Sequence, residues 1–322
     1  MKRLLALLLL VPVLALAWEP QPNRLITVYV PNAPGAGNEL AFRELSAIIA
    51  ETNPVPKFVI INQPGADGVV ALNNLLTAPT DGYHIMAPSY GGMYITNDIW
   101  EKDIKKFAWD TFPFTLSIGK SPLVLVAGVK SKINTPKEFE ELIAITKTPI
   151  NIAVGGGAHR TVFEYLMFKH HGNADLVKTA KFQGPLQAVT SVAQYDGVLG
   201  TEFGIMPITI AKPLIEAGKI KPIGFSGNKI MPQYPNVPLL NVGITAAWTI
   251  TMPPNTSQDI VDWYVKTLSA AIKTKQFQRW CYENVVYVDE NELTPAAVRK
   301  DAKQLRDTFL PILQKIDLTK DQ

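Results

Sequence analysis

The segment LITVYVPNAPGAGNELAFRELSAIIAE, residues 25–51, decides the fold of this chain. Residues 25–30 form a short β-branched apolar run, which is typical of a buried strand. Residues 39–51 repeat apolar side chains at helical spacing and predict an amphipathic helix. A glycine-containing loop, residues 31–38, joins the two. The segment therefore predicts a strand that runs through a glycine loop directly into a helix.

The following residues repeat this order. KFVII at 57–61 predicts a strand, residues 69–77 predict a helix, and YHIMA at 83–87 predicts a third strand. Strand–helix–strand order favours a parallel sheet with right-handed crossovers. Further along, strands are expected at 123–129, 150–154, 220–225 and 247–252, and helices at 135–145, 160–169, 185–194, 208–217, 257–274 and 294–315.

Composition excludes several classes of protein. The 322 residues are 47% hydrophobic and 18% charged, so the chain can bury a full core and is not a disordered tail. The single cysteine, Cys281, cannot form an internal disulfide or a cysteine-based zinc site. The four histidines form no H-E-x-x-H motif, and no G-x-S-x-G motif occurs. We therefore expect no catalytic residue, no metal site and no cofactor.

The N-terminus predicts export. Lys2 and Arg3 precede an uncharged run at 4–16. Ala15-Leu16-Ala17 has small residues at the two positions that a signal peptidase recognises. The run is too short for a membrane span, which needs about 20 residues. Residues 1–17 are thus predicted to be a signal peptide, and the product to be soluble and, in a Gram-negative source, periplasmic. The mature chain is nearly neutral, which argues against a nucleic-acid partner.

We expect two lobes that share connections rather than two independent domains. No Gly/Ser-rich linker divides the chain, and the strand–helix pattern continues through it. This pattern favours two α/β lobes with interwoven connections. We place one lobe at residues 18–124 together with 227–322, and the other at 125–226.

Two glycine-rich loops are candidate anion sites. Gly35 and Gly37 lead into the first helix, and GGGAH at 155–159 leads into another. A helix start presents unpaired N–H groups and a partial positive charge, which suit a carboxylate or phosphate. Arg160 beside the second loop could hold a carboxylate through two hydrogen bonds. A tight strand–helix turn without a ligand, and a solvated His159 or Arg160, fit the same residues.

Several blocks in order resemble the periplasmic solute receptors of tripartite tricarboxylate transporters, often called the Bug family. The resemblance spans Pro22 to Gln314. The family patterns I-T-x-V-V-P-F-x-P-G-G-G-x-D and x-N-x-P-G-A-G-G correspond to residues 26–39 and to INQPGADG. Each block is weak alone, and their order and spacing are specific. The matching stretches are ITVYVPNAPGAGNE (26–39), INQPGADG (61–68), PTDGY (79–83), PINIAVGGGAHRT (149–161), FQGPLQA (182–188), AGKIKPIGF (217–225) and MPQYPNVPL (231–239).

The resemblance implies an α/β, two-lobed, periplasmic-binding-protein-like fold of type II, a Venus flytrap with a central cleft. It implies a receptor that binds an organic acid between the two glycine loops, largely through backbone N–H groups and bridging waters, and presents it to a large and a small membrane subunit. We expect the receptor to be a monomer. Ligands of such receptors include di- and tricarboxylates, acidic amino acids and aromatic acids. The predicted ligand-binding residues are Pro34, Gly35, Ala36, Gly37, Asn38, Ser89, Tyr90, Gly156, Gly157, Ala158, His159, Arg160, Thr161, Gln183 and Gly184.

This sequence departs from the family pattern near the second loop. His159 and Arg160 replace a Thr-Ser pair, and Met206 stands where an Asp often falls. We therefore expect a more electropositive pocket, a ligand with more than one carboxylate, and no acid to bind the ammonium of an amino acid. A sensor that docks on a signalling ectodomain, or an enzyme on the same fold, remains an alternative.

Overall fold

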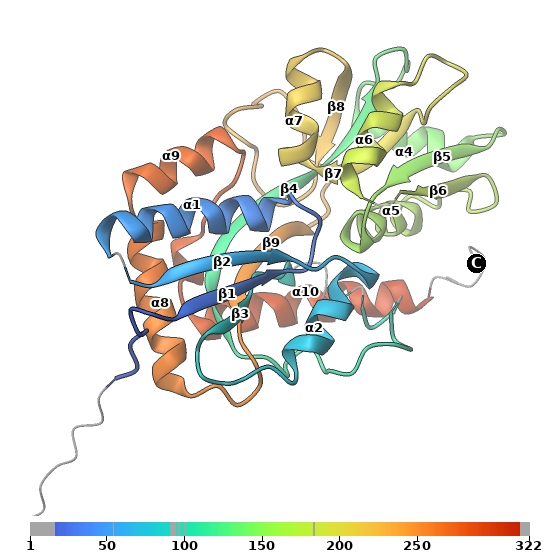
Figure 1. Cartoon of the computed structure of the whole chain (residues 1–322). Coiled ribbons are helices and arrows are strands. Elements are labelled where there is room, and N and C mark those ends of the chain that lie inside the picture. The colour runs from blue at the N-terminus through green and yellow to red at the C-terminus, as the bar shows by residue number, and fades with distance from the viewer. Residues whose placement is uncertain are drawn as a thin grey trace, which may run out of the picture.

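A computed structural model describes residues 17–53, 55–90, 95, 97–99, 101–182 and 184–315. Strands and helices form two groups that lie one above the other (Figure 1). The first group contains β1 (Leu25–Val30), β2 (Lys57–Asn62), β3 (His84–Met86), β9 (Thr245–Thr251), α1 (Gly37–Thr52), α2 (Val69–Leu75), α8 (Gln258–Ile272), α9 (Lys275–Glu283), α10 (Pro295–Lys315) and the short 3-10 turns η1 (Ala66–Gly68) and η2 (Glu290–Glu292).

The second group is built around the other strands. It contains β5 (Ile150–Val154), β6 (Val177–Lys181), β7 (Phe203–Pro207), β8 (Ile220–Phe225), α4 (Pro136–Ile145), α5 (Gly157–Lys169), α6 (Pro185–Ala193) and α7 (Ile208–Glu216). The strand β4 (Phe114–Gly128) belongs to both groups. This is the two-lobed α/β fold that the sequence predicted.

The sheet order is β2-β1-β3-β9-β4-β7-β5-β6, with β8 also paired to β4. β1 is parallel to β2 and β3, as predicted from the strand–helix alternation. β5 is parallel to β6 and β7, two strands that the sequence analysis did not predict. β9 is antiparallel to β3 and β4, and β4 is antiparallel to β7 and β8. The sheet is therefore mixed, with parallel strands in each lobe and antiparallel ones at the crossover.

β4 carries the chain from one lobe to the other. Its residues from Phe114 to Pro122 pair with β9, and those from Leu123 to Gly128 pair with β7 and β8. The sequence predicted only a strand at 123–129. The first half was missed because polar residues interrupt it. These residues are nevertheless buried: Ser121 Oγ, for example, donates to the carbonyl of Val285 at 3.2 Å.

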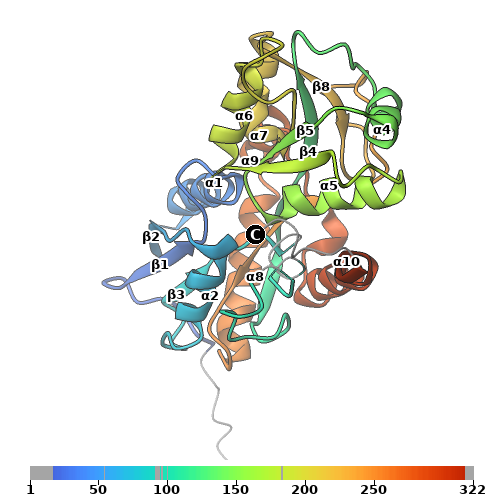
Figure 2. The same ribbon diagram turned by 90° about the vertical axis from the view of Figure 1, so that its right-hand side faces the viewer.

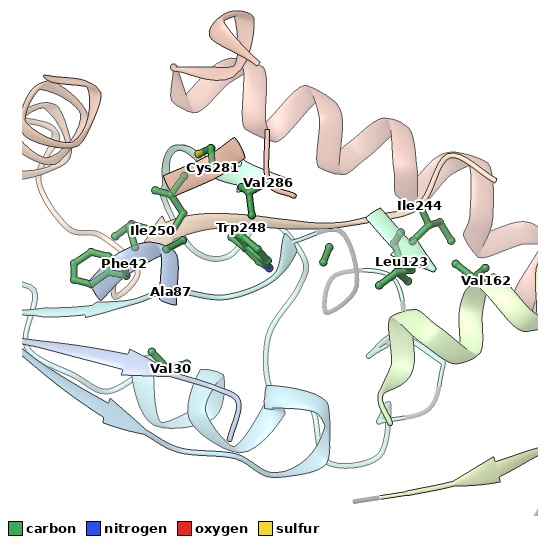
Figure 3. Close-up of a cluster of buried hydrophobic side chains, with 14 of the residues drawn as sticks. Val30, Phe42, Ala87, Leu123, Val162, Ile244, Trp248, Ile250, Cys281 and Val286 are labelled. Carbon is green, nitrogen blue, oxygen red and sulfur yellow. The ribbon is translucent and has the colours of Figure 1, made fainter. Parts of the chain in front are cut away.

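The hydrophobic core is continuous across the crossover. Trp248 and Ile250 of β9 pack on the first-lobe side, whereas Leu123, Ile244 and Val162 pack near the second lobe (Figure 3). On one flank, α5 lies against α10 through Tyr165 and Phe309, whose rings are 5.3 Å apart (Figure 2). Among the described residues, no helix is long and apolar enough to cross a membrane.

Capping signals in the sequence act as predicted. Thr135 Oγ1 accepts from the Glu138 amide at 3.2 Å, and Glu138 Oε2 accepts from the Thr135 amide at 3.1 Å, so a complete capping box starts α4. Thr294 Oγ1 accepts from the Ala297 amide at the start of α10. α5 starts at Gly157, earlier than predicted, so the last glycine of the second loop belongs to its first turn and Gly156 is its N-cap.

Candidate functional site

The first glycine loop is fastened to its own lobe. Gly35 has a φ of +85°, which glycine adopts readily. Its N–H donates to Oε2 of Glu39 at 2.7 Å. Asn62 Nδ2 donates to the same oxygen at 3.2 Å, and Arg43 Nε donates to Oε1 at 2.7 Å. Burial alone would raise the pKa of Glu39, but these hydrogen bonds from Arg43, Gly35 and Asn62 outweigh it and lower that pKa.

The start of α1 packs around Trp248. A Cβ atom on Gly37 would lie 2.4 Å from Cζ2 of Trp248, so only glycine fits without movement. Asn38 Nδ2 donates to the carbonyl of Ala87 at 2.6 Å, which ties α1 to the end of β3. Ser89, two residues on, pairs with Trp248 in an antiparallel bridge. Gly37, Asn38 and Ser89 therefore lie together, while Pro34 and Gly35 are exposed and Ala36 is half-buried.

Tyr90 differs from its predicted place. Its side chain is fully buried, and its hydroxyl donates to Glu292 at 3.4 Å. Lys120 Nζ binds Glu292 at 2.7 Å and Asp301 at 2.8 Å beside it. Burial, followed by the charges of Asp301 and Glu292, raises the pKa of Tyr90. The Tyr90 hydroxyl thus belongs to a buried polar cluster with Glu292, Lys120 and Asp301.

The second glycine loop meets the start of α6. A Cβ atom on Gly155 would lie 2.3 Å from the carbonyl carbon of Gly184 and 2.4 Å from the nitrogen of Pro185. Gly156 is the N-cap of α5, and Gly184 is the N-cap of α6. Two helix starts therefore abut, and the structure brings the predicted residues Gly156, Gly157 and Gly184 together. Gln183, also predicted, lies outside the described residues, as do residues 1–16 of the predicted signal peptide.

His159 is a neutral acceptor in this loop. Its side chain is 7% exposed, and its Nδ1 accepts from the N–H of Gly155 at 3.3 Å. Burial lowers the pKa of His159 to about 4, so the ring is uncharged at neutral pH. Ala158 precedes it in the first turn of α5, and Thr161 Oγ1 donates to the carbonyl of Gly157 at 3.0 Å within that helix.

Arg160 is buried and lies beside an acid. Its Nε is 3.4 Å from Oε1 of Glu164, one turn further along α5. The more electropositive pocket expected from His159 and Arg160 stays a prediction. His159 adds no charge, and the charge of Arg160 is opposed by Glu164. Neither relationship was visible in the sequence, because both depend on burial.

Asp67, which the sequence analysis did not single out, lies where the two lobes meet. It lies in η1, after β2, with a left-handed φ of +47°. A Cβ atom on Gly156 would lie 3.7 Å from Oδ1 of Asp67, so this first-lobe carboxyl group faces the second-lobe loop. Burial, together with the charge of Asp67, raises the pKa of Glu101. The available signal was the block INQPGADG, where Asp67 replaces a glycine of the family pattern.

The facing loops share one structural origin. The loops at 31–36 and 63–68 follow the parallel strands β1 and β2. Residues 155–156 follow β5, and residues 182 and 184 follow β6, which is parallel to β5. Carboxyl ends of parallel strands meet at one edge of a sheet, where ligands of α/β proteins bind. Helix-start amides at this edge can bind an anion. In the described part of the chain, no cluster of three His, Cys, Asp or Glu side chains could hold a metal ion.

Comparison with known proteins gives the family. Residues 41–304 match the model of the tripartite tricarboxylate transporter family receptor, TctC, and the chain belongs to this family of periplasmic solute receptors. A UPF0065 protein of Bordetella pertussis is 24% identical over 279 residues, which cover 82% of this chain and 81% of that protein. The family predicted from the sequence motifs is confirmed.

Solved structures share the fold. MatC of Rhodopseudomonas palustris with bound malate superposes with a TM-score of 0.78 at 18% identity, covering 91% of this chain and 100% of that one. Rpa4515 of R. palustris with adipate gives a TM-score of 0.79 at 17% identity, covering 91% and 97%. At these identities the likeness establishes the two-lobed fold.

Proposed function

We propose that this chain is an extracytoplasmic receptor that binds a small organic carboxylate between its lobes and delivers it to the membrane subunits of a tripartite tricarboxylate-type transporter. The observation that carries the proposal is the approach of Asp67, in the first lobe, to Gly156, at the start of α5 in the second. Helix-start amides at this meeting point suit a carboxylate. Family membership and the dicarboxylates bound by the two R. palustris proteins support it.

The lobes would move about the two strand connections. β4 changes partners between Pro122 and Leu123, and on the return path the amide of Ser226 donates to the carbonyl of Leu123 at 2.8 Å. These contacts support lobes at 18–124 with 227–322 and at 125–226, with a hinge where the two segments run side by side. Di- and tricarboxylates, as predicted from the sequence, are the first ligands to test.

We also propose that the receptor is exported after cleavage behind Ala17 and acts without chemical conversion of its ligand. Trp18, the first residue after that point, packs edge-on against Trp263 with ring centroids 5.3 Å apart, so cleavage there would keep the core intact. Cys281 is buried, and burial raises the pKa of its thiol to about 12, which is unsuitable for a nucleophile. The protein is proposed to act as a monomer.

A thermal-shift screen of the mature protein against small carboxylic acids tests the proposal. A ligand at 100 times its Kd should stabilise the receptor by about 2.7 kcal/mol, and mass spectrometry should recover it unchanged. Gly156→Val should abolish the shift, since its side chain would enter the space facing Asp67. Ala174→Val, at an exposed turn, is the matched control and should retain it. If no carboxylate raises the Tm of the wild type, the proposed function is wrong.

A further inference from the structure

A cavity of about 430 Å³ lies where α7, of the second lobe, meets the end of α9, of the first. This volume is within the usual range of small-molecule sites. Its walls come from α7, from the segment that returns to the first lobe between β8 and β9, and from α9, so a ligand in it would contact both lobes. The lining residues are Lys212, Glu216, Gln233, Tyr234, Tyr282 and Glu283.

The side chain of Gln233 presents a buried oxygen that has no donor. Its Nε2 donates to the carbonyl of Tyr282. Because a carbonyl oxygen can only accept, the amide NH2 group must face it, and the Gln233 Oε1 is turned away. Among the residues that the structure describes, this buried oxygen has no hydrogen-bond partner. A buried acceptor without a donor is costly, so its position in a cavity wall indicates where a ligand N–H would bind.

Two aromatic rings form another part of the wall. The ring of Tyr234 packs against Phe225, with centroids 5.7 Å apart, and its buried hydroxyl has no partner within the described residues. Burial, followed by the charge of Glu216, raises the pKa of Tyr234, so this hydroxyl stays neutral. Tyr282 is 59% exposed and supplies the second ring. Tyrosine rings attract organic cations through their faces.

The charged side chains of the cavity favour a cation over an anion. Lys212 Nζ lies 3.1 Å from Oε1 of Glu216, so these two charges oppose each other. Glu283 is a further acid, and one lysine against two glutamates leaves the lining with a net charge of −1. In the described part of the chain, no group of three His, Cys, Asp or Glu side chains could hold a metal ion. The cation that suits this lining is therefore an organic one.

We propose that this cavity is a second ligand site, which binds a small primary ammonium ion. The ammonium donates to Oε1 of Gln233, and the carboxylates of Glu216 and Glu283 balance its charge. Its hydrocarbon part packs against the rings of Tyr234 and Tyr282. A quaternary ammonium has no N–H for Gln233, and a neutral alcohol has no charge. The inference goes beyond the proposed function, because the glycine loops take no part in it.

Ligand-observed NMR titration of the mature protein in an amine-free buffer at pH 7 tests the inference. The probes are n-butylammonium, 1-butanol and tetramethylammonium, at constant ionic strength. We expect n-butylammonium to bind about tenfold more tightly than 1-butanol, because only the ammonium forms a charge-assisted hydrogen bond. Tetramethylammonium should bind about fivefold more weakly than n-butylammonium, because it keeps the charge but has no donor.

Two variants place the binding in this cavity. Gln233→Met removes the acceptor and keeps the length of the side chain, and should weaken n-butylammonium binding about fivefold. Gln304→Met, exposed on α10, is the matched control and should leave it unchanged. Glu283→Gln should weaken binding about twofold, since this carboxylate is exposed and its charge is screened by water. Glu141→Gln, exposed on α4, is its control.

The outcomes are independent of the carboxylate site. If no probe binds, or if 1-butanol binds as tightly as n-butylammonium, the inference is overturned. Unchanged n-butylammonium binding in both Gln233→Met and Glu283→Gln would place the cation elsewhere and overturn it as well. Circular dichroism checks the folding of Gln233→Met, and Glu283→Gln tests the same cavity from the protein surface. The proposed carboxylate function stands or falls on the thermal-shift screen alone.

Discussion

The first and second glycine loops both lead from a parallel strand into a helix, but they are held in different ways. In the first loop, the N–H of Gly35 donates a hydrogen bond to the carboxylate of Glu39, which lies behind the loop in the same lobe. In the second loop, the N–H of Gly155 donates a hydrogen bond to the neutral ring of His159. In the first loop the negative charge belongs to its own helix, whereas in the second the facing acid, Asp67, comes from the other lobe.

This difference shows how two similar turns acquire different roles. The charge behind the first loop is held by contacts within one lobe. The charge before the second loop comes from the other lobe. In the proposed receptor, a movement of the lobes would therefore change the surroundings of the second loop and leave those of the first unchanged. Three experiments can break or sharpen this comparison.

The largest effect is expected where the second loop meets α6. Gly155→Ala should lower the free energy of unfolding by about 3 kcal/mol, because the added Cβ would lie 2.3 Å from the backbone of Gly184, which cannot move aside. Gly184→Ala is the matched control, since its Cβ would meet no atom within 4 Å and its φ of −177° suits any residue. We expect it to cost less than about 1 kcal/mol. Urea unfolding measures both, and equal losses would contradict the close approach.

The second experiment uses pH to test the neutral acceptor. Because the pKa of His159 is lowered from 6.5 to about 4, the unfolded chain binds a proton more readily than the folded one between these values. Its contribution to stability is complete above pH 6.5 and is lost as the pH falls, by about 2 kcal/mol from pH 7 to pH 5. His159→Gln retains an acceptor for Gly155 but does not titrate. In this variant, the His159 contribution to the dependence of unfolding free energy on pH should therefore vanish.

Thermal or urea unfolding from pH 5 to pH 7.5 measures how the free energy of unfolding changes with pH, which is the slope compared here. His171→Asn, at an exposed left-handed turn, is the control and should keep the wild-type slope. A His159→Gln protein that loses stability with acid as steeply as the wild type would show that His159 is not buried as a neutral ring.

The smallest effect is expected at the first loop. Glu39→Gln should destabilise the protein by about 1.5 kcal/mol at pH 7, because Gly35, Asn62 and Arg43 all donate to the carboxylate and an amide NH2 group must face one of them. The pKa of Glu39 is lowered in the folded state, so its contribution is present above the unfolded pKa and is lost as the pH falls. The difference between the two proteins should therefore shrink below pH 4.

Glu51→Gln, exposed near the end of the same helix, is the control and should stay within about 0.5 kcal/mol of the wild type. Urea unfolding at pH 7 and at pH 3.5 provides the comparison. A cost for Glu39→Gln that is the same at both pH values would mean that the charge does not hold the loop.

Much of the fold could be predicted from local patterns. The strand at 150–154 and the strand at 220–225 have the predicted bounds, and the capping box of Thr135 starts its helix. The first half of β4 could not be found, because Ser117, Lys120 and Ser121 resemble a surface loop until their distant partners are known. The glycine loops at the strand ends could be located from the sequence, and the ligand-binding role of their residues stays a prediction.

The sequence by itself determined the alternation of strands and helices, the two glycine loops at strand ends and the receptor family, because periodicity and turn chemistry act over a few neighbouring residues. Only the tertiary structure decided the charge of the site. It made His159 neutral by burial, matched Arg160 with Glu164, and brought Asp67 against Gly156 across a sequence separation that no local pattern records. Burial and long-range approach are properties of the packed chain, and they set which ionic form each group adopts.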